Sequence, residues 1–140
     1  MLRTIIIDAE THIRETLAKL LARHRPWVVV VGKASGVKEG VNAILSLKPD
    51  LVFLDIDLKD GTGIDLLDSL NVIGFKIIFI AARDKNTIQA FKLSSVEYLL
   101  KPINADELKV ALRQLEEIDQ EGLALKLKAL EANLYENLTL

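Results

Sequence analysis

The sequence predicts an α/β domain built on a doubly wound parallel sheet of five strands, in the order 2-1-3-4-5. Short runs rich in valine and isoleucine alternate with longer stretches in which apolar residues recur at helical spacing. The short runs are mostly apolar at consecutive positions, as in strands buried on both faces. This alternation indicates βα units whose right-handed crossovers place helices on both faces of one sheet.

The expected strands are the short β-branched runs, such as TIII and LVFL. They cover residues 4–7, 27–31, 51–54, 76–80 and 96–100. The expected helices lie between and after them, at residues 10–24, 36–47, 63–70, 86–93 and 105–118. Pro26, Pro49 and Gly74 lie between a helical pattern and the next strand, where a helix has to end.

The last stretch, residues 119–140, adds no strand and carries a leucine at every third or fourth position. These residues are Leu123, Leu127, Leu130, Leu134 and Leu138. The stripe predicts a helix that continues the fifth one, with a possible break at Gly122. It either packs on its own domain or, as we favour, pairs with a second chain or leads to a further domain. We therefore expect a domain over residues 1–118 and a helical extension, linker or dimerisation helix over 119–140.

Composition excludes several classes of protein. Half of the 140 residues are hydrophobic, which excludes intrinsic disorder. No apolar run approaches the roughly 20 residues of a membrane span, so we expect no membrane partner. The absence of cysteine excludes disulfides and thiolate metal sites, and we expect a cytoplasmic protein. The net charge of −2 gives no basic excess for nucleic-acid binding by this chain itself.

Acidic residues follow the first and third expected strands. Asp8 and Glu10 come after the first strand, and Asp55 comes after the third. In this strand order the two strand ends flank the switch point, so the carboxylates should converge there. Packed carboxylates repel, so a cation is expected nearby, and the candidates are Mg²⁺ and Lys101, which directly follows the fifth strand.

Such a carboxylate can act as a nucleophile toward phosphorus, with the cations neutralising charge on the phosphoryl group. Alternatively, acids at strand ends are solvated or cap the next helix. For Asp8 and Asp55 alone the two interpretations are even, and Lys101 followed by Pro102 favours the functional one.

Four segments resemble the receiver domain of two-component response regulators. They are IIIDAE, DLVFLDIDLKDGTGIDLL, IIFIAA and VEYLLKPI, which occur in this order within residues 2–118. The resemblance implies the flavodoxin-like receiver fold. The segment VEYLLKPINADEL and the leucine-rich tail look most like regulators whose receiver precedes a LytTR-type DNA-binding domain.

The resemblance also implies roles for individual residues. Asp55 aligns with the phosphoacceptor, and Lys101 with the lysine that contacts the phosphoryl group. Asp8 aligns with the first acid of the metal-binding pair, and Asp57 with the position whose backbone carbonyl binds the metal. Pro102 aligns with a proline that often follows a cis peptide bond.

Further implied features concern switching and partners. Tyr98 aligns with the aromatic residue that changes rotamer on activation, and Gly61 and Gly63 lie in the loop after the acceptor. The implied cofactor is Mg²⁺, and the implied partner is a sensor histidine kinase. The domain is expected to be a phosphoacceptor and not an enzyme beyond its own self-catalysed phosphoryl transfer.

Two positions depart from the family pattern. Ala9 replaces the second acid of the pair, so Mg²⁺ binding should be weak, and Glu10 is an uncertain substitute. Ala81 replaces a Thr or Ser whose hydroxyl bonds the phosphoryl group. The lost hydrogen bond is worth roughly 1.5–3 kcal/mol, comparable to a typical allosteric coupling of about 1–3 kcal/mol.

These observations leave two main functional hypotheses. The first is a receiver phosphorylated on Asp55 that switches an output domain, for instance in transcription regulation. It would form a homodimer through residues 84–118 or the C-terminal helix, and would reach DNA only through an output domain absent from this sequence. The alternative is a pseudo-receiver, a phosphorylation-independent interaction module. A flavodoxin-like ligand binder is a weaker third hypothesis, because no Gly-rich loop follows the first strand.

Overall fold

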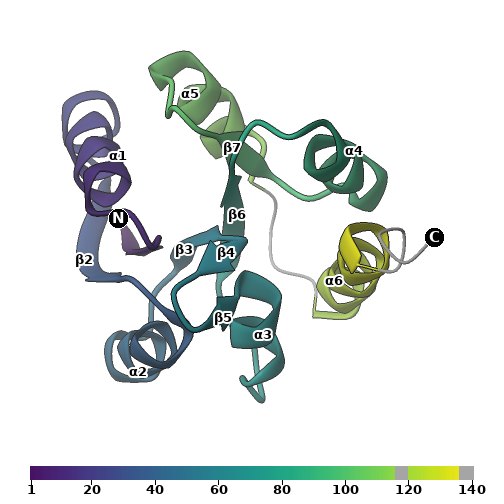
Figure 1. The fold of residues 1–140 in the computed structure, drawn as a ribbon. Coiled ribbons are helices and arrows are strands. Elements are labelled where there is room, and N and C mark those ends of the chain that lie inside the picture. Colours follow the sequence, from purple (N-terminus) through teal and green to yellow (C-terminus); the bar gives the residue numbers. More distant parts are fainter. Residues whose placement is uncertain (116–119, 136–140) are drawn as a thin grey trace.

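The structure is a computed structural model that describes residues 1–115 and 120–135. Five parallel strands form the central sheet in the order β2-β1-β3-β6-β7 (Figure 1). Counted without the two short strands of a separate ribbon, this is the predicted order 2-1-3-4-5. The strands are β1 (Leu2–Ile7), β2 (Val28–Ala34), β3 (Leu51–Asp55), β6 (Lys76–Ala81) and β7 (Tyr98–Leu100).

Two details of the strands were not predicted. β2 runs past its valine run, because Gly32 and Lys33 continue to pair with β1 after a shift of register. The loop after β3 also contains a two-stranded antiparallel ribbon, β4 (Asp57–Leu58) and β5 (Gly61–Thr62). Strands of two residues are too short to produce a periodic signal in the sequence.

Helices cover both faces of the sheet (Figure 1). On one face α1 (Thr11–His24) and α5 (Ala105–Arg113) enclose a core that includes Ile6 and Phe53. The opposite face carries α2 (Val37–Leu47), α3 (Gly63–Asp68), α4 (Lys85–Ser94) and α6 (Gln120–Tyr135). Ile5 and Ile7 point to that second face, so one apolar run supplies both cores because successive strand side chains alternate.

The last two helices differ in their limits from the sequence prediction. α5 ends at Arg113 and α6 begins at Gln120, so Gly122 lies inside α6 and the predicted break at Gly122 is wrong. A single glycine inside a helix weakens it by only about 1 kcal/mol, which surrounding packing can offset. The predicted boundary between residues 118 and 119, and Leu138, lie outside the described residues.

α6 packs on its own domain, in the space between α3 and α4 (Figure 1). Leu130 is fully buried and Leu134 is 9% exposed, and both belong to the core on that face. Leu123 and Leu127 are half-buried against the same core. Pairing of this helix with a second chain stays a prediction.

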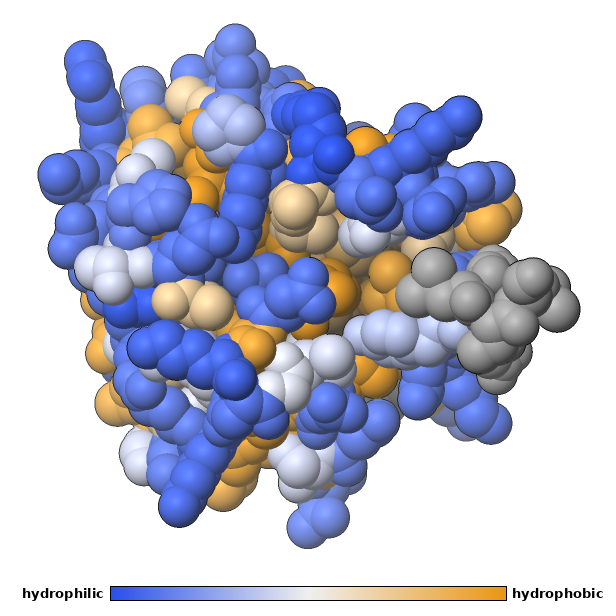
Figure 2. Space-filling model, viewed as in Figure 1, coloured by the Kyte–Doolittle hydropathy of each residue, from blue (hydrophilic) through white to orange (hydrophobic). Residues whose placement is uncertain are grey.

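Hydrophilic residues cover most of the surface seen in Figure 2, and hydrophobic residues show between them in small separate areas. Within residues 1–115 and 120–135, no helix is both long enough and apolar enough to cross a membrane.

The burial of Leu130 predicts that α6 contributes to the stability of the domain. Leu130→Ala should lower the free energy of unfolding by about 2–4 kcal/mol, because it leaves a cavity in the core. The matched control is Leu125→Ala on the same helix, where the leucine is 70% exposed and the change should stay within about 0.5 kcal/mol. Urea unfolding measures both, and equal effects would show that α6 does not pack as described.

Candidate functional site

The candidate site begins where β1 and β3 end side by side. Ile7 of β1 pairs with Leu54 of β3, so Asp8, which follows β1, and Asp55, the last residue of β3, lie next to each other at the edge of the sheet. Asp8 is fully buried and Asp55 is 3% exposed. The convergence of these carboxylates follows from the strand order alone, as predicted from the sequence.

Lys101 brings a positive charge to these acids from the end of β7. Its backbone N–H donates to the Ala81 carbonyl at 2.9 Å, and its peptide bond to Pro102 is cis. The ammonium Nζ lies 3.1 Å from Asp55 Oδ2 and 3.3 Å from the Asp8 carboxylate. It also lies 3.2 Å from Glu10 Oε1, so one cation contacts three carboxylates.

Backbone groups hold the two buried carboxylates in place. Asp8 Oδ1 accepts a hydrogen bond from the Glu10 N–H at 2.8 Å. Asp55 Oδ1 accepts one from the Asp57 N–H at 3.2 Å, while the side chain of Asp57 is exposed. Each acid therefore organises the loop that follows its own strand.

The electrostatics of the site penalise the charge on Asp55. Burial and the neighbouring charge of Asp8 raise the pKa of Asp55 to about 7, although Lys101 and the Asp57 N–H act in the opposite direction. Burial alone would lower the pKa of Lys101. The charges of Asp55 and Asp8, with the hydrogen bonds to Asp55 and Glu10, outweigh that effect and raise it.

One oxygen of the site is suited to a metal ion. Asp8 Oδ2 is buried and accepts no hydrogen bond from the described residues, although the Lys101 ammonium lies 3.3 Å from it. Over those same residues, no group of three or more His, Cys, Asp or Glu side chains is arranged to hold a metal. The carboxylates of Asp8 and Asp55 and the backbone carbonyl of Asp57 nevertheless suit Mg²⁺, which commonly keeps several waters and takes only one or two carboxylates. Asp8 and Asp55 therefore fit such an ion.

The two departures from the family pattern have clear positions. Ala9 is half-buried between the two acids of its loop, where its methyl group supplies no oxygen. Ala81 is 4% exposed at the end of β6; its backbone carbonyl accepts a hydrogen bond from the Lys101 N–H, and its methyl side chain can neither donate nor accept one. The edge of the sheet between Asp55 and Lys101 therefore lacks a hydroxyl at this position.

Three aromatic rings stack beside the site. The Phe91 ring of α4 lies between the ring of Tyr98 in β7, at 5.0 Å between centroids, and that of Phe79 in β6, at 5.8 Å. Tyr98 is half-buried in this stack. Its ring thereby links β7 directly to α4.

The loop after Asp55 depends on a close backbone approach. A Cβ added at Gly63 would lie 2.6 Å from the Asp55 carbonyl oxygen, and Gly61 has a φ of +152°. Both positions thus require glycine for reasons of space or backbone conformation.

Sequence reasoning missed the role of Asp60 in this loop. Its carboxylate accepts hydrogen bonds from the N–H groups of Val37 and Lys38, which begin α2. These bonds lower the pKa of Asp60, the bond from Val37 most. The cap crosses from one segment to another, so local spacing in the sequence gives no sign of it.

Comparison with known proteins identifies the family. A family model described as the response regulator receiver domain matches residues 4–113. The chain belongs to the response regulator receiver family. It is 40% identical over 116 residues to an uncharacterized response regulatory protein of Vibrio cholerae, covering 82% of this chain and 48% of that protein.

Other relatives agree with this assignment. The receiver is 30% identical over 128 residues to the sensory transduction protein LytT of Bacillus anthracis, covering 90% of this chain and 52% of LytT. This agrees with the expected likeness to LytTR-type regulators. The chain spans about half the length of these relatives.

Solved structures support the fold. The receiver domain of AraT from Geobacillus stearothermophilus matches with a TM-score of 0.68 at 23% identity, covering 80% of this chain and 91% of that one. The signal receiver domain of a protein named for the Luxo repressor, from Vibrio parahaemolyticus, has a TM-score of 0.66 at 25% identity. That match covers 99% of this chain and 96% of the other.

The raised pKa of Asp55 predicts that this receiver loses stability as the pH rises. The folded chain holds a proton on Asp55 up to about pH 7, whereas the unfolded chain releases it near 3.8. The free energy of unfolding should therefore decrease as the pH rises from about 3.8 to about 7. Asp55→Asn should remove this loss, so that it is more stable than the parent at pH 8 by about 4 kcal/mol and nearly equal to it at low pH.

Urea unfolding in chelating buffer at several pH values measures this difference. Because the same chain with one substitution is the reference, contributions from titrating groups that do not contact Asp55 cancel. Parallel pH profiles for the two proteins would show that Asp55 is not held at a raised pKa.

The close approach at Gly63 predicts a second stability effect. Gly63→Ala should cost about 1–3 kcal/mol, because its new methyl group meets backbone that cannot move freely. Gly74→Ala is the matched control, since no atom lies within 4 Å of its added Cβ, and it should change stability by no more than about 0.5 kcal/mol. Thermal unfolding distinguishes the two, and equal losses would contradict this account.

Proposed function

We propose that this receiver serves a two-component system by accepting a phosphoryl group on Asp55 from a sensor histidine kinase. The observation that supports this most is the position of Lys101, whose ammonium lies within 3.3 Å of both buried carboxylates. A nucleophile, an acidic neighbour and a cation thus meet at the carboxyl ends of β1, β3 and β7, where ligands of such sheets bind.

The proposed step is a displacement at phosphorus. A carboxylate oxygen of Asp55 forms a bond to phosphorus while the bond from phosphorus to the donor histidine nitrogen breaks. That nitrogen keeps the electron pair, and Asp55 becomes an acyl phosphate. Lys101 balances negative charge on the phosphoryl oxygens, a contribution that electrostatic positioning makes in phosphoryl transfer generally.

Four residues are proposed to hold Mg²⁺. Asp8 and Asp55 offer carboxylates, Asp57 offers its backbone carbonyl, and Glu10 is near enough to Lys101 to reach the same region. When bound, the ion would neutralise charge on the phosphoryl group. Because Ala9 removes one acid and Lys101 already contacts the other carboxylates, we expect weak Mg²⁺ binding.

We further propose that phosphorylation controls a separate output. A phosphoryl group adds a charge of about −1.5 to −2 next to Lys101, which follows β7 directly. Homodimer formation through residues 84–118 or the C-terminal helix would be one response. Control of DNA binding and transcription would need an output domain, as the relatives' greater length allows.

A second candidate is a phosphorylation-independent pseudo-receiver. It is favoured by Ala9 and Ala81, and by the three carboxylates that already surround the Lys101 ammonium. In that case the cluster would be a permanent structural ion pair, and the surfaces of the domain would bind a partner without chemistry.

Intact mass spectrometry distinguishes the two candidates. Incubation with acetyl phosphate and Mg²⁺ should add the mass of one phosphoryl group to the chain. Asp55→Asn should abolish the adduct, whereas Asp57→Asn should retain it, because that side chain is exposed and only its backbone is proposed to act. Half-maximal labelling should require millimolar Mg²⁺, as expected of a weak site.

Two results would contradict the proposal. One is an adduct that persists in Asp55→Asn, which would place the modification elsewhere. The other is no adduct on a chain shown to be folded, which would favour the pseudo-receiver.

A further inference from the structure

The C-terminal helix α6 fills a place between α3 and α4 on one face of the sheet (Figure 1). Its fully buried residue Leu130 and nearly buried Leu134 share one core cluster with Ala90 and Phe91 of α4. The helix is therefore part of the domain's core and not an appendage to it.

The contact surface of α6 on α4, called its seat below, is formed by specific residues. Ala90 and Ser94 lie one helical turn apart on α4 and are 2% and 3% exposed, so small side chains line the contact. The Asn133 Nδ2 donates to Ser94 Oγ at 3.0 Å. Because Ser94 is buried in an apolar contact, sliding α6 along α4 would break the bond and take the Asn133 partner away from its hydroxyl. The hydrogen bond thus selects one register.

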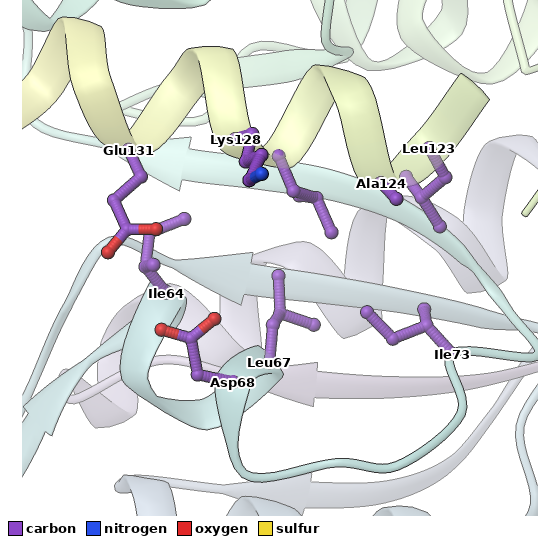
Figure 3. Close-up of a pocket in the computed structure, with 9 residues that line it drawn as sticks. Ile64, Leu67, Asp68, Ile73, Leu123, Ala124, Lys128 and Glu131 are labelled. Atoms are coloured by element: carbon purple, nitrogen blue, oxygen red, sulfur yellow. The ribbon is translucent and has the colours of Figure 1, made fainter. Parts of the chain in front are cut away.

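The contact of α6 with α3 is looser. A cavity of about 210 Å³ separates residues 123–131 of α6 from α3 and the segment after it. In Figure 3, Leu67 and Ile73 point toward Leu123 and Ala124 of α6 across this space. Close packing on α4 and loose packing on α3 mean that the contact with α4, more than the contact with α3, holds α6 in place.

α4 is in turn connected to the candidate site through β7. Phe91 stacks on Tyr98 at the start of β7, and Lys101 directly follows the end of that strand. A phosphoryl group on Asp55 would draw the Lys101 ammonium away from Asp8 and Glu10, and would pull on β7. This route does not need the hydroxyl that Ala81 lacks.

We propose that α6 is a displaceable helix whose seat on α4 is coupled to the state of Asp55, so that phosphorylation loosens α6. The packing contact of α6 fits the position that α4 has in the unmodified chain, and the Ser94–Asn133 hydrogen bond fixes its register. A shift of α4 therefore weakens it. The inference rests on the proposed function and names the element that moves in response.

Hydrogen exchange of the full chain tests this coupling. Backbone amides of residues 123–135 should exchange about tenfold faster after treatment with acetyl phosphate and Mg²⁺, in samples whose adduct is verified by intact mass. Amides of β1 and β3 should not change. An adduct with unchanged exchange in α6 overturns this inference and leaves phosphorylation standing. Absence of any adduct overturns both, so the mass spectrum tells the two failures apart.

A pair of variants tests the seat itself. Ser94→Ala should speed exchange in α6 about fivefold in the unmodified chain, as expected from loss of one hydrogen bond. Leu93→Ala is the matched control, since that leucine of α4 is 62% exposed and should leave α6 unchanged. An unchanged α6 in Ser94→Ala would overturn the inference.

The coupling between α6 and Asp55 must act in both directions, so it can also be measured as a change in ligand affinity at the site. A hydrogen bond with a purely structural role would not change that affinity. If phosphorylation loosens α6, loosening α6 must favour the phosphorylated state by the same factor. Ser94→Ala should therefore bind beryllofluoride, a phosphoryl mimic, more tightly in the presence of Mg²⁺, by at most the fivefold by which it loosens α6. Equal affinities for Ser94→Ala and the parent chain would overturn the coupling.

Discussion

The contact of one ammonium group with three carboxylates is the interaction on which the site depends. Parallel strands β1 and β3 deliver Asp8 and Asp55 to the same buried edge, where like charges repel and water is excluded. The charge of Lys101, only 3.1–3.3 Å away, offsets part of this cost, and the pKa of Asp55 stays raised. Any chemistry at Asp55 must rearrange this cluster, so the residues joined to Lys101 are the first to respond.

The stacked rings link the end of the sheet that carries Lys101 to α4 and, through α4, to α6. Lys101 follows β7, Tyr98 of β7 stacks on Phe91 of α4, and α4 carries the buried contact with α6. A closely packed core does not deform gradually. When one of its elements moves, the neighbouring elements shift to another discrete packing arrangement. The loose side of α6, against α3, leaves room for such a displacement.

Much of this architecture could be predicted from local patterns. The apolar runs gave the five sheet strands, and their order placed Asp8, Asp55 and Lys101 at one edge. The β4–β5 ribbon was missed because its strands have two residues each. The break before α6 was misplaced because Gly122 favours a break locally, whereas the packing of Leu123 and Leu127 on the core stabilises the helix that contains it. The cap on α2 was missed because Asp60 comes from a distant segment.

The sequence by itself determined the fold family, the strand order and the identity of the acids, since these depend on periodicity and on residue type at strand ends. Only the tertiary structure decided which carboxylates the Lys101 ammonium contacts and where α6 lies. Both depend on distances between segments far apart in the chain. The leucine stripe shows that α6 has an apolar face, but an apolar face binds any apolar surface. The small residues of α4 and the Ser94–Asn133 bond select one of these surfaces.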